Sequence, residues 1–376
     1  MRKVLSVIVA ALMLCGVFTA CSKPVEEPSA SPTQIVTETV APTATPQPTP
    51  EIPTDVSPTT GLPGNTVYKP IIVQIDNAAS ARPQSGISYA DIVYETDIDG
   101  YDTRLTALFN DALNGENAPS ELVVGPVRSS RYYHQWIQGE WDALYVHMGG
   151  PDSTGMDETD IWGASAEHIQ QRINGAGKHA SNTEYFFALR DGKPASDYAG
   201  IDLIKALNVY NYDPVAKQAF TYYPLQDYAD QPMVEKIAFT FSKDLGSISY
   251  GYDEGNDKMM RFVNHEEFTD ATTGDQVGVQ NLIVQFVNDK AANDAPQSDR
   301  RIVDVEGSGK ALFLIHGKLM EGTWERPSYD DKTTYKLASG EEVTLTPGNT
   351  WIEMHPTGKD VQVTMADGTE QTFTGE

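Results

Sequence analysis

The sequence predicts an α+β or α/β domain followed by a mostly β domain, and it places both behind a signal peptide and a disordered linker. In the first half, short apolar strand-like runs alternate with segments of helical periodicity. In the second half, short alternating runs are separated by turn residues, which is typical of β structure. A proline-rich stretch near the start cannot form a core, and the rest of the 376-residue chain is long enough for two. The predicted parts are residues 1–21, 22–58, 59–230 and 231–376.

The first 21 residues have the organisation of a bacterial lipoprotein signal peptide. Arg2 and Lys3 precede an apolar run over Val4–Phe18, and small residues stand immediately before Cys21. The run has about 15 residues and a spanning helix needs roughly 20, so cleavage is favoured over an uncleaved anchor. We therefore expect a mature extracytoplasmic protein that begins at a lipidated Cys21, carries an acyl chain such as palmitate, and is anchored to the cell membrane. An ordinary signal peptide without lipidation is the alternative.

Residues 22–58 form the predicted disordered tether. They contain nine prolines and eleven serines or threonines and no aromatic residue. Such a composition buries too little apolar surface to offset the entropy of ordering, and its prolines favour extended conformations. The segment would hold the following domains clear of the membrane.

The first domain is expected to contain five strands and two helices. The strands are Ile71–Ile75, Asp91–Glu95, Leu105–Phe109, Leu122–Val124 and Leu144–His147, and the helices are Ser130–Gln138 and Ile201–Val209. The domain should end near Asp230, because the segment around Pro224 and Pro232 has no periodicity.

The second domain is expected to be mostly β. Its predicted strands are Ile237–Phe241, Ser247–Tyr252, Met259–Val263, Leu282–Val287, Ile302–Val305, Ala311–Ile315, Thr334–Leu337 and Glu342–Leu345. Glycine or Asp/Asn turns separate many of them.

Charge and cysteine usage exclude several functions. The formal net charge is −26, which repels nucleic acid and anionic lipid headgroups. The only cysteines are Cys15 and Cys21, so the body after the signal has no thiol nucleophile, disulfide or thiolate metal site. The expected partners are the membrane through the lipid anchor, and a cell-wall component or an envelope protein.

Six short sequence motifs in the first domain are distinctive in their residues and in the order in which they occur. They are Ile75–Asn77 (IDN), Arg82–Gly86 (RPQSG), Ala90–Glu95 (ADIVYE), Thr103–Arg104 (TR), Gly125–Arg131 (GPVRSSR) and His147–Gly150 (HMGG). This pattern resembles the YerB-like bacterial lipoproteins, the DUF3048 family of paired N- and C-terminal domains. The second domain is similar to that family through Asn281–Gln285, Gly322–Trp324 and Pro347–Ile352, and the chain departs from the pattern at Asp99–Asp102. The resemblance implies an exported, tethered, two-domain protein and no particular reaction.

Polar residues at the predicted strand ends are the candidates for ligand binding. They are Arg82, Arg104, Arg128, Arg131, Asn77, Gln84 and Ser85. Arg128 and Arg131 lie three apart at the start of a predicted helix, so they share one face and can bind a carboxylate or phosphate. The alternative is that these arginines pair internally with Asp76, Asp91, Glu95 or Asp142, as the excess of acidic residues favours.

His147 is the candidate general base of an alternative enzymatic function. It ends a predicted strand before Gly149 and Gly150, and Asp76, Glu95 or Asp142 could orient it. No Gly-x-Ser-x-Gly nucleophile motif accompanies it.

Two acidic loops are candidates for binding calcium, and no other cofactor is expected. Asp97, Asp99 and Asp102 surround Gly100, and a second loop extends over Asp152–Asp160. Hard cations prefer such oxygen ligands, but the spacing is not that of an EF-hand, and acidic turns are commonly just solvated.

The sequence thus predicts a membrane-tethered binding or scaffolding module at the cell envelope, with an Arg/Asp/His cleft in its first domain. The alternative is an envelope hydrolase that uses His147 as the base. Whether the chain is an enzyme at all stays open at this point.

Overall fold

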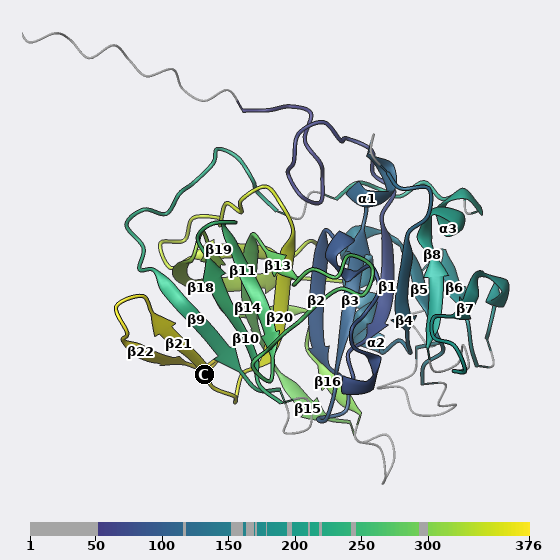
Figure 1. Cartoon of the computed structure of the whole chain (residues 1–376). Helices are drawn as coiled ribbons and strands as arrows, with labels where there is room; N and C mark the ends of the chain where they lie inside the picture. Colours follow the sequence, from purple (N-terminus) through teal and green to yellow (C-terminus); the bar gives the residue numbers. More distant parts are fainter. Residues whose placement is uncertain are drawn as a thin grey trace, which may run out of the picture. The chain divides into compact units, whose positions relative to one another are not determined.

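Strands from both halves of the chain hydrogen-bond into one mixed 13-stranded sheet (Figure 1). The computed structural model describes residues 52–115, 118–151, 161–162, 169, 171–177, 179–193, 198–209, 211–217, 220–241, 246–292 and 300–376. The main path of this sheet runs β19-β18-β17-β14-β20-β2-β3-β1-β4-β8-β7, and β5 pairs with β1 and β6.

The strands of the large sheet come from two stretches of the sequence. The first stretch supplies β1 (Ile71–Asp76), β2 (Ile92–Asp97), β3 (Thr103–Phe109), β4 (Val123–Val127), β5 (Leu144–His147), β6 (Arg172–Asn174), β7 (Phe186–Ala188) and β8 (Ala199–Asp202). The second supplies β14 (Asn281–Val287), β17 (Gly307–Ile315), β18 (Lys318–Arg326), β19 (Thr334–Leu337) and β20 (Thr350–Pro356).

A second sheet of seven strands comes from the C-terminal half alone. It contains β9 (Val234–Phe239), β10 (Ile248–Asp253), β11 (Lys258–Val263), β12 (Glu266–Glu267), β13 (Gly278–Val279), β21 (Val361–Met365) and β22 (Glu370–Phe373). A separate ribbon pairs β15 (Asp289–Ala291) with β16 (Arg301–Val303).

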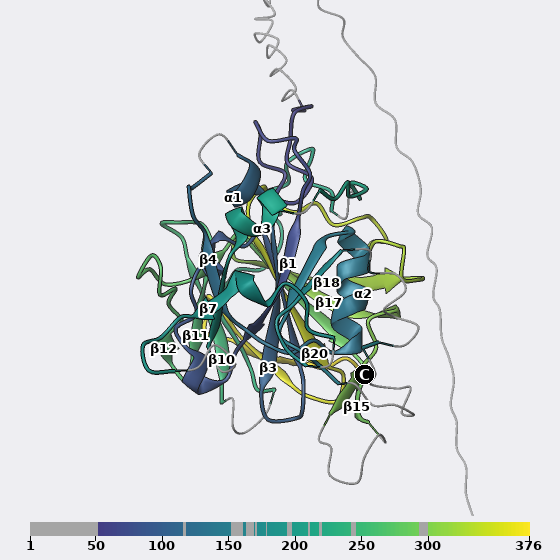
Figure 2. The same ribbon diagram turned by 90° about the vertical axis from the view of Figure 1, so that its right-hand side faces the viewer.

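Three α-helices occur among the described residues, and the ten-residue α2 is the longest of them. They are α1 (Asp111–Asn114), α2 (Tyr132–Trp141) and α3 (Leu203–Val209). Tyr133, Ile137 and Trp141 of α2 are four residues apart, so they form one apolar stripe that packs on the large sheet (Figure 2). In the part of the chain that the structure describes, no helix has the length and apolar character to cross a membrane.

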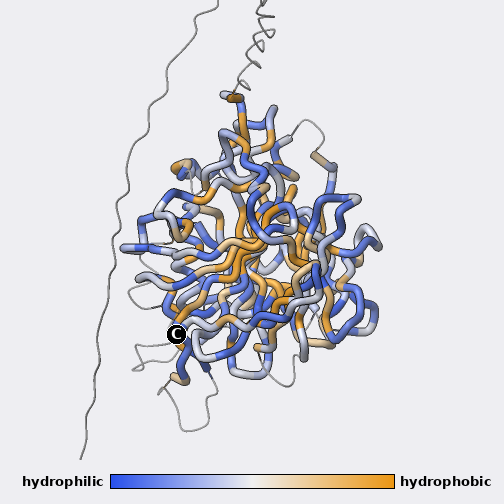
Figure 3. Tube along the Cα trace, turned by 90° about the vertical axis from the view of Figure 1, so that its left-hand side faces the viewer, coloured by the Kyte–Doolittle hydropathy of each residue, from blue (hydrophilic) through white to orange (hydrophobic). Residues whose placement is uncertain are grey.

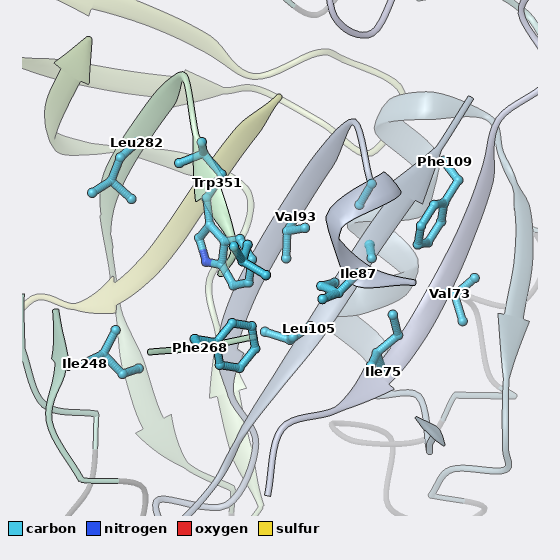
Figure 4. Packing of buried hydrophobic residues seen from close by; sticks show 14 of the residues in the cluster. Val73, Ile75, Ile87, Val93, Leu105, Phe109, Ile248, Phe268, Leu282 and Trp351 are labelled. Carbon is cyan, nitrogen blue, oxygen red and sulfur yellow. The ribbon is translucent and has the colours of Figure 1, made fainter. Parts of the chain in front are cut away.

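The core lies on both faces of the large sheet. Along β1, Ile71, Val73 and Ile75 join one buried cluster, whereas Ile72 joins the cluster under α2. This alternation follows from the period of two in a strand, and it explains why a strand covered on both faces is a continuous apolar run. The apolar residues concentrate in the centre of the molecule (Figure 3), where Val73 and Leu105 share a cluster with Leu282 and Trp351 (Figure 4).

The two halves of the chain are joined by parallel pairing of β2 with β20. The register runs from Ile92 opposite Thr350 to Thr96 opposite Met354, and β20 pairs on its other side with β14. The boundary predicted at 230/231 therefore divides the sequence, but one sheet and one apolar cluster extend across it. The four predicted parts of the chain stay predictions.

The fold is mostly β, and the α+β or α/β class expected for the first half is not confirmed. All five strands predicted there are present, but most of their pairings are antiparallel. The first two residues of the predicted helix Ile201–Val209 belong to β8, and α3 starts at Leu203. In the second half, seven of the eight predicted strands are confirmed. Glu342–Leu345 is not a strand but makes isolated bridges, and β12, β13, β15, β18, β20, β21 and β22 were not predicted.

Candidate anion-binding site

Four arginines gather where β1, β3 and β4 meet the start of α2. We call this set the arginine edge: Arg82, Arg104, Arg128 and Arg131. The antiparallel register places Arg104 of β3 directly opposite Asp76, the last residue of β1. Arg128 follows the last residue of β4, and Arg131 is the N-cap residue of α2. Strand register and strand ends therefore bring these residues together.

Asp76 is a carboxylate shared by two of these arginines. Its Oδ2 accepts a hydrogen bond from Arg128 Nε at 2.8 Å, and its Oδ1 lies 3.8 Å from Arg104 Nη2. Arg104 Nη1 donates to the carbonyl of Ser129 at 2.6 Å. The internal pairing that the sequence left open is thus present for Arg104 and Arg128.

Asp76 does not balance the positive charge around Arg104. Burial first, and then the nearby Arg131 and Arg128, lower the pKa of Arg104 to about 10, while Asp76 opposes them. The pKa of Arg131 is also lowered, chiefly by burial. The Nε atoms of Arg104 and Arg131 are buried and meet no acceptor among the described residues. Buried N–H donors without acceptors are rare and costly, so this edge offers donors and positive charge to an anion.

The other predicted ligand-binding residues support the edge from inside. Asn77 Nδ2 donates to Glu95 Oε1 at 2.9 Å and to Thr103 Oγ1 at 2.8 Å. Arg82 Nη2 donates to the Asn77 carbonyl at 2.7 Å, and Gln84 Nε2 donates to the Asp76 carbonyl at 2.9 Å. The Ser85 backbone N–H bonds to the carbonyl of Gly125. These contacts fix the end of β1, and ligand binding by these residues stays a prediction.

His147 lies beside the arginine edge, but its ring is buried. Met148 N–H donates to the Arg128 carbonyl and Ser130 N–H to the Gly149 carbonyl, so the two segments run side by side. His147 Nδ1 donates to the Gly149 carbonyl at 2.8 Å, and burial lowers the pKa of the ring to about 3. A base with so low a pKa is weak at neutral pH.

The carboxylates expected beside His147 have other partners. Glu95 Oε2 pairs with Arg261 Nη2 at 2.7 Å, and Asp142 Oδ2 accepts from the backbone N–H of Val215 at 2.8 Å. Asp76 belongs to the arginine edge, as described above. The catalytic role of His147 therefore stays a prediction without a carboxylate contact among the described residues.

The predicted calcium loop uses its carboxylates to close a turn. Asp97 Oδ1 accepts from the backbone N–H groups of Asp99 and Gly100, and Asp99 Oδ1 accepts from those of Tyr101 and Asp102. The described residues contain no cluster of three or more side chains suited to a metal ion. The second acidic loop, Asp152–Asp160, lies outside the described residues, as does Cys21. Calcium binding stays a prediction.

Sequence reasoning missed a buried ion cluster where the two halves meet. Arg261 of β11 donates to Glu95 of β2 and, at 2.8 Å, to Glu353 of β20, and all three are fully buried. The Tyr250 hydroxyl donates to Glu353 at 2.5 Å. A signal was present, because Arg261 and Glu353 each interrupt an otherwise apolar strand, as in Trp351-Ile352-Glu353-Met354. Such residues are almost never buried unless they are paired.

Both halves of the chain match models of one protein family. Residues 59–207 match the N-terminal domain, and residues 237–352 match the C-terminal domain, of a family described as a protein of unknown function, DUF3048. The chain belongs to the DUF3048 family. All four residues of the arginine edge lie within the N-terminal match, and the Arg261 cluster joins the two matches.

A relative and a solved structure agree with this membership. The chain is 27% identical over 327 residues to the "Putative lipoprotein YerB" of Bacillus subtilis (strain 168), covering 83% of this chain and 89% of that protein. The crystal structure of the Bacillus subtilis YerB protein has the same fold, with a TM-score of 0.63, 24% identity and coverage of 80% of this chain and 96% of that one. The DUF3048 resemblance inferred from the short runs is therefore confirmed.

Proposed function

We propose that this DUF3048 protein is a membrane-tethered lipoprotein whose body binds an anionic component of the cell envelope at the arginine edge. The observation that carries the proposal is the crowding of the buried Arg104 and the half-buried Arg131, whose buried Nε–H donors have no acceptor among the described residues. A phosphate or carboxylate with several oxygens would supply the acceptors and the opposite charge.

The cluster of arginines at this edge is unusual, because the chain as a whole is strongly acidic. A protein of net charge −26 repels most anions at long range, so an arginine-rich edge marks the place where an anion is tolerated. A tether suits this function, because a long flexible segment lets a domain reach a polymer away from the membrane.

The test compares two matched double variants of the full chain. Arg104→Gln/Arg131→Gln removes two charges from the arginine edge, and Lys193→Gln/Lys205→Gln removes two from exposed positions elsewhere. Calorimetry with poly(glycerol phosphate) and with polyglutamate at about 0.15 M salt should give at least a roughly tenfold loss of affinity in the first variant. The lysine variant should stay within about twofold of wild type. Equal losses in both, or no binding by wild type, would exclude the arginine edge as the site.

Tethering is tested separately through Cys21. Cells supplied with a radioactive fatty acid should label the wild-type chain and leave Cys21→Ser unlabelled and out of the membrane fraction. A Cys21→Ser protein that keeps both label and membrane location would contradict the lipoprotein part of the proposal. Cys15→Ser is the matched control, because it changes the other cysteine.

A further inference from the structure

Three loops of the C-terminal half meet at the imidazole of His316. His316 lies in the turn between β17 and β18, Asp257 in the turn between β10 and β11, and Thr346 in the segment before β20. His316 Nδ1 lies 2.6 Å from Asp257 Oδ2, and its Nε2 lies 2.7 Å from Thr346 Oγ1. The hydroxyl, imidazole and carboxylate thus form a continuous hydrogen-bonded chain.

The direction of these hydrogen bonds follows from the chemistry of the groups. An ionised carboxylate only accepts, so Nδ1 of His316 carries the proton that it shares with Asp257. The Nε2 atom of the neutral ring is then an acceptor, and the Thr346 hydroxyl must donate to it. This is the arrangement in which an imidazole can withdraw a proton from a hydroxyl nucleophile.

Neighbouring contacts hold both ends of the chain. The second oxygen of Asp257, Oδ1, accepts from the Tyr252 hydroxyl at 2.9 Å. The backbone of Thr346 is held by Asn281, whose Oδ1 accepts the Thr346 N–H and whose Nδ2 donates to the Thr346 carbonyl, each at 2.9 Å. His316 retains 29% of its side-chain exposure and Asp257 retains 43%, so the group is open to solvent and to a substrate.

A groove of about 510 Å³ adjoins these loops. Its lining includes Lys258 and Pro347, which directly follow Asp257 and Thr346 in the chain, together with Tyr89 and Gln280. Asp257, His316 and Thr346 themselves lie beside the groove and do not line it. This volume lies within the range typical of small-molecule sites, and residues of both family domains line it.

We propose that Thr346, His316 and Asp257 form an acyl-transfer site for small carboxylic esters. Thr346 Oγ bonds to the acyl carbon as its proton moves to His316 Nε2, and the ester bond to the leaving alcohol breaks as that proton passes to the alcohol oxygen. Water, deprotonated by His316, then attacks the acyl–threonine ester and restores the hydroxyl. Asp257 positions the ring. This activity goes beyond the binding function above and uses none of the arginines of that edge.

The experiment measures hydrolysis of p-nitrophenyl acetate by the full chain and maps the acetylated residue by mass spectrometry. Thr346→Val keeps the shape and removes the hydroxyl, and we expect it to lower kcat/KM at least about a hundredfold and to abolish acetylation of Thr346. Thr346→Ser should retain the activity, and His316→Gln should lose it. His265→Gln is the control, because His265 is an exposed imidazole in another hairpin turn and its loss should leave the rate unchanged.

Thermal unfolding of each variant separates chemistry from folding. If the three side chains serve only to hold the loops, Thr346→Val will lower the melting temperature while the hydrolysis rate equals that of wild type. That result, or a wild-type rate no higher than that of Thr346→Val, overturns the proposal. Acetylation of surface residues with Thr346 unmodified overturns it as well.

Discussion

Arg261 and Arg104 are both buried, but carboxylates surround them very differently. Arg261 faces two glutamates, Glu95 and Glu353, and lies against three aromatic rings, with its guanidinium carbon 4.5 Å from the ring centre of Trp351. Arg104 shares the single carboxylate of Asp76 with Arg128, at 3.8 Å, and has Arg131 nearby. The pKa of Arg261 is raised, whereas that of Arg104 is lowered.

This difference in carboxylate partners indicates that Arg261 stabilises the fold, whereas the arginines of the arginine edge can bind an anion. Around Arg261 the partners are supplied by β2, β11 and β20, so the cation joins both halves of the chain without needing a ligand. At the arginine edge, by contrast, Arg104 and Arg128 share the one carboxylate of Asp76. The Nε–H groups of Arg104, Arg131 and Arg261 all lack an acceptor among the described residues, so the number of carboxylates per arginine is what distinguishes the two regions. Hydrogen bonds also connect the two regions, because Asn77 donates to Glu95 and accepts from Arg82. Opposite responses to mutation are therefore expected in regions that are hydrogen-bonded to each other.

The largest expected effect is on stability, from Arg261→Met. Removing the guanidinium leaves two buried glutamates without their cation, and breaking a buried ion pair in this way costs about 3–5 kcal/mol. Urea unfolding should register that loss. Arg128→Met is the matched control, because the Arg128 side chain is 36% exposed and its loss should cost about 1 kcal/mol or less. Similar losses of unfolding free energy in the two variants would show that Arg261 contributes no more to stability than Arg128 does.

The second effect is a dependence of the unfolding free energy on pH. It tests whether both Glu95 and Glu353 are ionised beside Arg261. Burial, and then the neighbouring Glu95, raise the pKa of Glu353 from 4.5 to about 8. A raised carboxyl pKa means that the folded state holds a proton that the unfolded state releases. The stability contributed by Glu353 is therefore full below about pH 4.5 and is lost as the pH rises through about 8.

Glu353→Gln should remove this dependence, because glutamine keeps an acceptor for Tyr250 and Arg261 without titrating. From pH 5 to pH 8.5, the unfolding free energy of wild type should fall relative to that of the variant by on the order of 1–3 kcal/mol. Subtracting the two curves cancels Asp91, whose pKa is also raised to about 8. A constant difference across this range would show that Glu353 stays ionised beside Arg261.

The same contrast explains what could be predicted from the sequence. The arginine edge was foreseen because its residues stand at strand ends, where a turn of the chain interrupts the apolar pattern. Arg261 was missed because it lies inside the alternating strand Met259–Val263, where only the partner strands reveal that it is paired. The central strand β20 was missed for a related reason. Its run Thr350–Pro356 contains Glu353 and His355, which are buried only because the strand pairs on both edges.

The α+β or α/β class expected for the first half was left unconfirmed for the same reason. Strand-like runs were recognised one by one, but local patterns do not say whether neighbours pair in parallel. Here β1 and β3 are antiparallel partners, whereas β2 finds its parallel partner β20 more than two hundred residues later in the chain. Long-range register is a tertiary property, and so is the burial of Glu95 beside Glu353 that follows from it.

The smallest expected effect is on anion binding at the arginine edge. Asp76→Asn removes the carboxylate that competes with an incoming anion for Arg104 and Arg128, so affinity for poly(glycerol phosphate) should rise by about 1 kcal/mol, or about fivefold. The unfolding free energy should fall by roughly 1–3 kcal/mol, because the change leaves the buried Arg104 without its counter-charge. Calorimetry and urea unfolding of the same protein would thus give opposite signs. If affinity fell together with stability, Asp76 would be needed to hold the arginines in place, and the arginine edge would resemble the Arg261 cluster after all.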